Sequence, residues 1–291
     1  MVPTSSGNPT PAWDLASFVS FMEEEHADKA IISFSEPSAN IHLGNKSATV
    51  ALARLMNEQA AAYCAAYPDR FKFNAVVPLP YVSEAIAEAQ YAIQRLGAAG
   101  IFLTSNFEGT YLGNAIFKPF FQALDEMDGK KMLSVHPGPP YIKYEDQYVI
   151  DGNPTTYPIG TVEFYFETAR TLMDLTLSGY LLQFTSINYI VPYAGGAFPA
   201  TIDRILRPSS PVYNSSLQIF QNRFWWDTAG LTFDHQVESL LSYGIPKSQL
   251  VFGSVCIRDL DRVYEVLIAA LPSGLPLFFG FRQERFIERN S

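Results

Sequence analysis

The sequence has few cysteines, no long apolar run and no excess of positive charge, and each absence excludes a class of protein. Cys64 and Cys256 are the only cysteines in 291 residues, and their wide separation disfavours a disulfide framework or a structural zinc site. No apolar run approaches the roughly 20 residues that span a bilayer. The N-terminal segment has no basic start followed by an apolar stretch, so the sequence shows no signal peptide. We therefore expect a cytoplasmic protein without a membrane segment.

The charge and the composition narrow the expected partners. A formal net charge of -9 disfavours binding to nucleic acid or to an anionic membrane surface. Hydrophobic residues make up 48% of the chain and charged residues 17%, which is enough apolar material for a substantial core. The aromatic share of 14% suits a large apolar pocket, although bulky core packing explains it equally well. We expect a small-molecule substrate.

Strand-like runs alternate with helical or loop segments along the chain. Seven runs have the length and apolar character of buried strands: 29–34, 71–77, 100–103, 132–135, 186–191, 224–226 and 250–252. Repeated strand–helix units imply parallel strands with right-handed crossovers. A (β/α)₈ TIM-barrel of about 250 residues matches this pattern. A doubly wound open sheet is the rival, which is weakened because no glycine-rich phosphate loop follows any strand.

The predicted domain organisation is simple. We expect one α/β domain over residues 1–291, with a flexible Ser/Pro/Gly-rich segment at 1–11. The region 138–160, rich in proline, glycine and tyrosine, is predicted to be a long loop, and so is 207–216. The last periodic segment, 258–271, is predicted to be a helix.

Several motifs occur together in a characteristic order. They are the segments 67–71, 78–80, 96–100, 106–113, 135–137, 163–170 and 193–199, followed by 226–229 and 252–254. In this order, over most of the chain, they resemble the amidohydrolase-related family that includes aminocarboxymuconate-semialdehyde decarboxylase and fungal salicylate-type decarboxylases. The order makes the resemblance far more specific than any single motif.

The resemblance implies a distorted (β/α)₈ barrel with a divalent metal, usually zinc, at its C-terminal face. In the family the ligands are a His-x-His pair on the first strand, a histidine after the middle strand and an aspartate after the last. A further histidine in the Ala-Gly-Gly motif assists catalysis. His136 matches the middle-strand ligand, but Tyr193 replaces the Ala-Gly-Gly histidine and Val255 stands in place of the aspartate.

The family's His-x-His pair does not occur anywhere in this sequence. The predicted barrel therefore lacks or replaces its first strand. One imidazole cannot hold zinc, which takes three or four protein ligands. The remaining histidines, at 26, 42 and 235, form no pair with ligand spacing. We expect no metal and no cofactor.

Three residues at strand ends are candidates for catalysis. His136 precedes a proline at the face where barrel enzymes place their sites. An imidazole with an ordinary pKa of about 6.5 suits general acid–base work, although a purely structural hydrogen bond is the alternative. Tyr193 could stabilise an oxyanion or fill the space of lost ligands. Asp227 could orient His136 or accept a proton, and the alternative is an N-cap or a loop salt bridge.

Five further residues are candidates for substrate contacts. They are Asn106, Phe107, Tyr111, Phe164 and Trp226. The first three lie in a loop that matches a pocket loop of the family, and the aromatic residues would form an apolar wall or belong to the core. Glu167 and Arg170, three residues apart on a predicted helix, are expected to form an ion pair.

Two classes of function follow. The first is a metal-independent lyase or cyclase that carries out decarboxylation or dehydrative cyclisation on an aromatic or polyketide-like molecule, in secondary metabolism. The alternative is an inactive relative that acts as a small-molecule binder or partner subunit. An open sheet edge would need a cover, and the apolar residues in 275–281 could supply it or form a homodimer interface.

Overall fold

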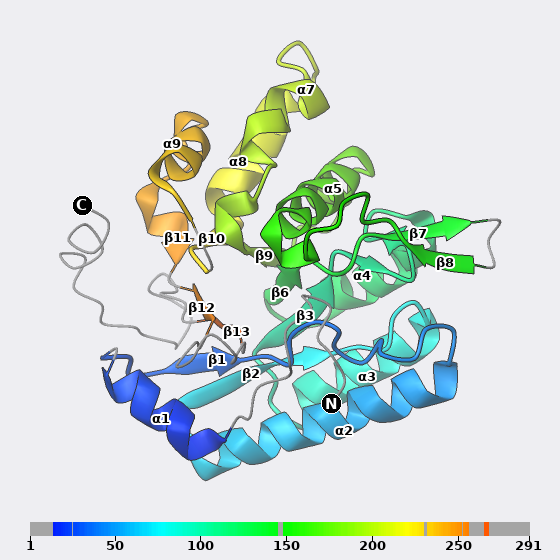
Figure 1. The fold of residues 1–291 in the computed structure, drawn as a ribbon, viewed down its shortest axis with the longest axis vertical. Coiled ribbons are helices and arrows are strands. Elements are labelled where there is room, and N and C mark those ends of the chain that lie inside the picture. Colours follow the sequence, from blue (N-terminus) through cyan, green and yellow to red (C-terminus); the bar gives the residue numbers. More distant parts are fainter. Residues whose placement is uncertain are drawn as a thin grey trace.

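The computed structural model describes residues 14–24, 26–144, 148–229, 232–251, 253–255 and 265–267 (Figure 1). The segment 1–11, predicted to be flexible, and the apolar residues in 275–281 lie outside these ranges. Among the helices that the structure describes, none combines the length and the apolar character that crossing a bilayer requires.

All seven predicted strands form one parallel, curled sheet. In chain order they are β1 (Ala30–Ile32), β2 (Phe71–Val76), β3 (Gly100–Thr104), β6 (Lys131–His136), β9 (Ile187–Val191), β10 (Phe224–Asp227) and β11 (Leu250–Val251). Each pairs in parallel with the next strand of the series. Their carboxyl ends therefore meet on one face, where barrel folds place their chemistry. The predicted α/β barrel architecture is confirmed.

An antiparallel strand completes the sheet next to β1. After β11, the chain continues as β12 (Gly253–Val255), and β13 (Glu265–Leu267) pairs antiparallel with both β12 and β1. Leu267 lies across from Ile31 on one side and from Gly253 on the other. This strand therefore extends the sheet beyond β1. The helix predicted over 258–271 is wrong at 265–267, because pairing with two strands outweighs local periodicity.

Helices cover the outer face of the sheet. They are α1 (Leu15–Glu24), α2 (Lys46–Ala66), α3 (Val82–Gln94), α4 (Lys118–Glu126), α5 (Glu163–Leu177), α6 (Tyr180–Gln183), α7 (Ile202–Leu206), α8 (Tyr213–Asn222) and α9 (Asp234–Ser242). Helix α2 begins at a side-chain cap, because Asn45 Oδ1 accepts a hydrogen bond from the Ala48 N–H at 3.1 Å. Figure 1 shows α1, α2 and α3 along β1 and β2, with α8 and α9 beside β10.

Two predicted loops contain regular structure. The region 138–160 includes the hairpin β7 (Tyr141–Tyr144) and β8 (Tyr148–Asp151), with Ile142 across from Ile150. Alternating tyrosine and isoleucine suit a strand, and the two strands pair with each other rather than with the barrel sheet (Figure 1). Within 207–216, α8 already begins at Tyr213. A smaller hairpin joins β4 (Asn106–Phe107) to β5 (Thr110–Tyr111).

An aromatic layer lies between β9, β10 and their helices. The ring of Tyr189 stacks on Phe224 with centroids 4.7 Å apart, and Phe224 stacks on Trp226 at 5.3 Å. Tyr189 is fully buried, and its hydroxyl has no hydrogen-bond partner among the described residues. A buried polar group without a partner costs free energy.

Substitution of Tyr189 by phenylalanine is expected to stabilise the protein. Removing this hydroxyl should raise the free energy of unfolding by roughly 1 kcal/mol, because the desolvation cost disappears. The matched control is Tyr180→Phe, since the Tyr180 hydroxyl donates a hydrogen bond to the Asn114 carbonyl oxygen at 3.1 Å. That variant should lose about 1 kcal/mol. Urea unfolding of both variants measures the contrast, and equal destabilisation would contradict it.

Candidate active site at the barrel mouth

His136 is the last residue of β6 and lies in an aromatic surround at the mouth of the barrel. It is 6% exposed, and Thr104 of β3 is its partner in the sheet register. Its ring stacks on Phe102 with centroids 5.9 Å apart and meets Phe164 edge-on at 5.6 Å. The Tyr193 hydroxyl lies 3.3 Å from His136 Nε2. The two catalytic candidates predicted at 136 and 193 are therefore in direct contact.

A strained turn directs Tyr193 at the histidine. Tyr193 and Ala194 have φ angles of 57° and 47°, and the two glycines that follow also have positive φ. Left-handed backbone is unfavourable for a bulky side chain and persists only where the surroundings enforce it. Gln236 Nε2 donates hydrogen bonds to the carbonyl oxygens of Tyr193 and Gly196, and the Tyr165 ring stacks on Tyr193 at 5.3 Å. These contacts hold the phenol in place.

Asp227 fixes the same turn from the end of β10. Its Oδ1 accepts hydrogen bonds from the Tyr193 N–H at 3.2 Å and the Ala229 N–H at 2.9 Å. The side chain is 2% exposed and lies against Gly253, where an added Cβ would approach Asp227 Cγ to 2.9 Å. Asp227 thus acts on the backbone of Tyr193 by accepting hydrogen bonds at this turn.

Glu36 is a functional candidate that the sequence motifs did not reveal. It follows β1 in the loop at the mouth of the barrel, and its Oε1 is buried. Burial raises the pKa of Glu36 to about 7, and the positive charge of His136 opposes that rise. Burial raises the pKa of Tyr141, and the charge of Glu36 adds to that rise. In the sequence, the one feature that could have pointed to Glu36 is its position directly before Pro37, shortly after a predicted strand.

The five predicted substrate residues divide into three groups. Phe164 alone adjoins His136. Phe107, 2% exposed, packs edge-on against Phe117, and Trp226 is fully buried in the aromatic layer between the sheet and its helices. Asn106 and Tyr111 both donate hydrogen bonds to Glu167, at 2.9 and 2.6 Å. The loop 106–111 is therefore tied to α5.

The predicted ion pair on α5 is confirmed. Arg170 NH1 lies 2.8 Å from Glu167 Oε1 and 3.6 Å from Glu163 Oε2. Glu167 is fully buried and Glu163 is 4% exposed, so both acidic partners of Arg170 lie in the interior. Burial alone would lower the pKa of Arg170, but its neighbours outweigh this effect and raise the pKa, above all Glu167.

The donor set that the described residues present at the mouth does not fit a zinc ion. Tyr193 presents a phenol to His136, and the Asp227 carboxylate accepts two backbone N–H groups. Within the described part of the chain, no group of three His, Cys, Asp or Glu side chains is placed to share a metal ion. A zinc site needs three or four such ligands. His235 is almost fully exposed on α9, beside Glu238.

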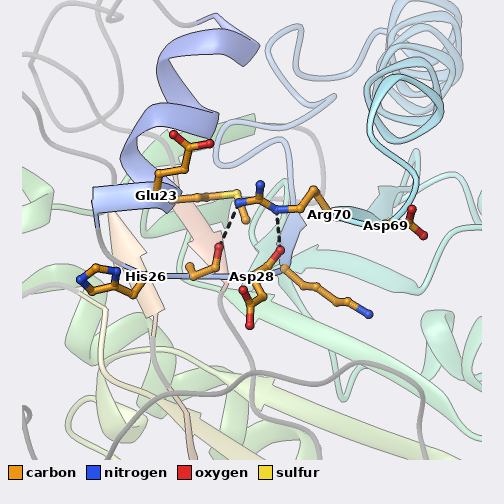
Figure 2. A pocket seen from close by; sticks show the side chains of 8 residues that line it. Glu23, His26, Asp28, Asp69 and Arg70 are labelled. Atoms are coloured by element: carbon orange, nitrogen blue, oxygen red, sulfur yellow. Dashed lines mark hydrogen bonds between the residues drawn. The ribbon is translucent and has the colours of Figure 1, made fainter.

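A shallow hollow of about 450 Å³ lies on the opposite face of the barrel (Figure 2). Its lining residues are Met22, Glu23, His26, Ala27, Asp28, Lys29, Asp69 and Arg70. Most of them directly precede β1 or β2, so the hollow adjoins the amino ends of these strands and is separate from the mouth. The Arg70 guanidinium donates hydrogen bonds to the carbonyl oxygens of Asp28 at 2.6 Å and Ala27 at 3.1 Å, which closes one wall.

The raised pKa of Glu36 predicts a pH-dependent loss of stability. The carboxyl group of Glu36 makes its full contribution to the free energy of unfolding below its ordinary pKa of 4.5. This contribution is lost as the pH rises through about 7, because ionising the group costs more in the folded state than in the unfolded state. Glu36→Gln should therefore become more stable than the natural protein over this range, by on the order of 2–3 kcal/mol at pH 8. Glu126→Gln, on an exposed residue of α4, is the control. Parallel urea curves at pH 5 and pH 8 give the test, and a pH-independent difference contradicts it.

The comparisons with known proteins agree with this fold. The amidohydrolase family model matches residues 7–254. The decarboxylase yanB of Aspergillus niger is 30% identical over 209 residues, which cover 69% of this chain and 56% of that protein. A 6-methylsalicylic acid decarboxylase of Penicillium expansum is 29% identical over 258 residues, covering 86% of this chain and 76% of its own length.

A solved structure shows the same architecture. The crystal structure of an amidohydrolase II protein superposes with a TM-score of 0.76 over 87% of this chain and 79% of that one, at 24% identity. At this identity the likeness establishes the fold alone. The family match covers most of the sequence, and the parallel strands lie in the expected order. The chain therefore belongs to the amidohydrolase family.

Proposed function

We propose that this chain is a metal-independent lyase that releases CO₂ from a phenolic aromatic acid of the 6-methylsalicylate type. The observation that carries the proposal is the contact of 3.3 Å between the Tyr193 hydroxyl and His136 Nε2 at the barrel mouth. One relative acts on 6-methylsalicylic acid and another is a decarboxylase, which supports this reaction class.

The reaction needs one proton delivered to one carbon. A protonated His136 gives its proton to the ring carbon that bears the carboxylate, and a C–H bond forms there. The bond between that carbon and the carboxylate then breaks, its electron pair restores the aromatic ring, and CO₂ leaves. Water reprotonates the neutral imidazole. A positioned acid of this kind contributes about 10²–10⁴-fold to a rate.

The neighbours of His136 suit this step. Glu36, when ionised, stabilises the imidazolium through its negative charge, which is the same interaction that opposes the rise in the Glu36 pKa. The Tyr193 oxygen can accept a hydrogen bond from Nε2, and at 3.3 Å this bond is long enough to yield to a substrate. The rings of Phe102 and Phe164 pack against the imidazole and make its surroundings apolar. A carboxylate in such surroundings loses hydration, and its conversion to neutral CO₂ removes that cost.

Metal independence rests on the side chains that the mouth offers. A phenol stands where the family has a histidine, and His136 is the one residue at the mouth that matches a family ligand position. No step of the proposed reaction requires a Lewis acid, because protonation of the ring carbon lets the ring accept the electron pair of the breaking C–C bond.

A binder without catalytic activity is the second candidate. The engagement of Asn106, Phe107, Tyr111 and Trp226 in internal contacts favours it, since these side chains have little freedom to adapt to a reacting substrate. Saturable binding of 6-methylsalicylate without CO₂ release by the natural protein would support this function and exclude the lyase.

Substitution of His136 tests the lyase directly. His136→Gln should lower kcat for CO₂ release from 6-methylsalicylate by about 10²-fold or more, because the proton donor is lost. Tyr193→Phe should have a smaller effect of about tenfold, since one hydrogen bond to the imidazole disappears. The control is His42→Gln, which changes an exposed histidine. Undiminished turnover in His136→Gln would exclude the proposed role.

A further inference from the structure

A buried carboxylate on α5 is linked to the turn that carries His136. We infer that Glu167 is a positioning residue for His136, acting through Ser105 and Asn106 on the backbone that follows β6. The inference rests on the proposed function of His136. It assigns to Glu167 a role beyond the ion pair with Arg170.

Glu167 gathers four hydrogen-bond donors from separate parts of the chain. Oε2 accepts from Ser105 Oγ at 2.8 Å and from Asn106 Nδ2 at 2.9 Å. Oε1 accepts from the Tyr111 hydroxyl at 2.6 Å and from Arg170 NH1 at 2.8 Å. The side chain is completely buried. A buried carboxylate with four donors is held in one orientation, since a change of rotamer would leave charge and donors without partners.

Ser105 and Asn106, the two donors to Oε2, also form hydrogen bonds with the turn that follows His136. Ser105 Oγ accepts a hydrogen bond from the Gly138 N–H at 3.0 Å, and Asn106 Nδ2 also donates to the Pro139 carbonyl oxygen at 2.8 Å. The direction of the Ser105 relay is fixed, because an amide N–H can only donate and a carboxylate can only accept. Glu167 thus fixes the chain two and three residues after His136.

The same helix touches both reactive groups. Phe164 packs edge-on against His136, and Tyr165 stacks on Tyr193. Tyr165 also accepts a hydrogen bond from the Ala197 N–H at its carbonyl oxygen, at 3.1 Å. Because Glu167 ties α5 to the turn after β6, its bonds set the position of the imidazole relative to the phenol.

Glu163 provides a matched control on the same helix. It lies one turn before Glu167, is also buried and also approaches Arg170, at 3.6 Å. No hydrogen bond recorded among the described residues links it to the turn after His136. A purely structural need for negative charge on α5 would apply to both glutamates, whereas the positioning role applies only to Glu167.

The test compares Glu167→Gln, Ser105→Ala and Glu163→Gln. An amide at 167 cannot accept from all four donors, and alanine at 105 removes the link to Gly138 while leaving the carboxylate. Both variants should lower kcat for 6-methylsalicylate by about tenfold to a hundredfold with KM within about threefold, as misplacement of a catalytic group does. Glu163→Gln should keep both constants.

A second readout does not depend on turnover. Selective ¹⁵N labelling of the 4 histidines allows the His136 ring signals to be assigned by their loss in His136→Gln. These signals should shift in Ser105→Ala and in Glu167→Gln, and stay unchanged in Glu163→Gln. If the natural protein releases no CO₂, the lyase proposal fails and the ring signals alone decide the relay. If Glu167→Gln does not fold, Ser105→Ala decides it. Folded Ser105→Ala with natural kcat and unchanged His136 signals would overturn the inference.

Discussion

The buried carboxylate of Glu167 joins parts of the barrel mouth that the chain itself keeps far apart. It binds side chains that follow β3, a tyrosine of the β4–β5 hairpin and an arginine of its own helix. The energetic reason is simple, because an ionised group without water must receive strong hydrogen bonds from the protein. Satisfying this one charge orders the loop 106–111, α5 and the turn after β6 together.

A second constraint acts from the other side of the mouth. Hydrogen bonds to Asp227 and Gln236 hold the run of positive φ angles that begins at Tyr193. The phenol therefore reaches His136 from a backbone conformation that is unfavourable without these contacts. In the family, a histidine occupies this position. In this chain the phenol of Tyr193 provides a hydrogen-bonding group at the end of β9. Glu36 adds a carboxyl group to the mouth, and its burial makes protonation favourable near neutral pH.

Strand order was predictable from the sequence because each buried run is bounded by turn residues and followed by a helical period. The hairpin strands β7 and β8 and the strand 265–267 were not predictable, since their stability comes from pairing with other strands rather than from local pattern. At the site, the motif positions of His136 and Tyr193 predicted their encounter. Glu36 lies in a loop without periodicity, so only its burial and its charge environment reveal it.

The loop 106–111 shows why motif position alone does not assign a role. Asn106 and Tyr111 lie in the predicted segment, yet their polar atoms are directed at Glu167. Phe107 and Trp226 have aromatic side chains suited to a pocket wall, yet they fill the core. Periodicity distinguishes the two faces of a strand but cannot tell which buried aromatic residues border a cavity.

The central claim is that acid–base chemistry at His136 proceeds without a metal ion. The most direct measurement combines elemental analysis of the purified protein with the rate of CO₂ release from 6-methylsalicylate, before and after dialysis against a chelator. The account predicts turnover by protein that contains far less than one metal ion per chain, at a rate that neither the chelator nor added zinc or manganese changes. Stoichiometric metal whose removal abolishes turnover and whose return restores it would contradict the account.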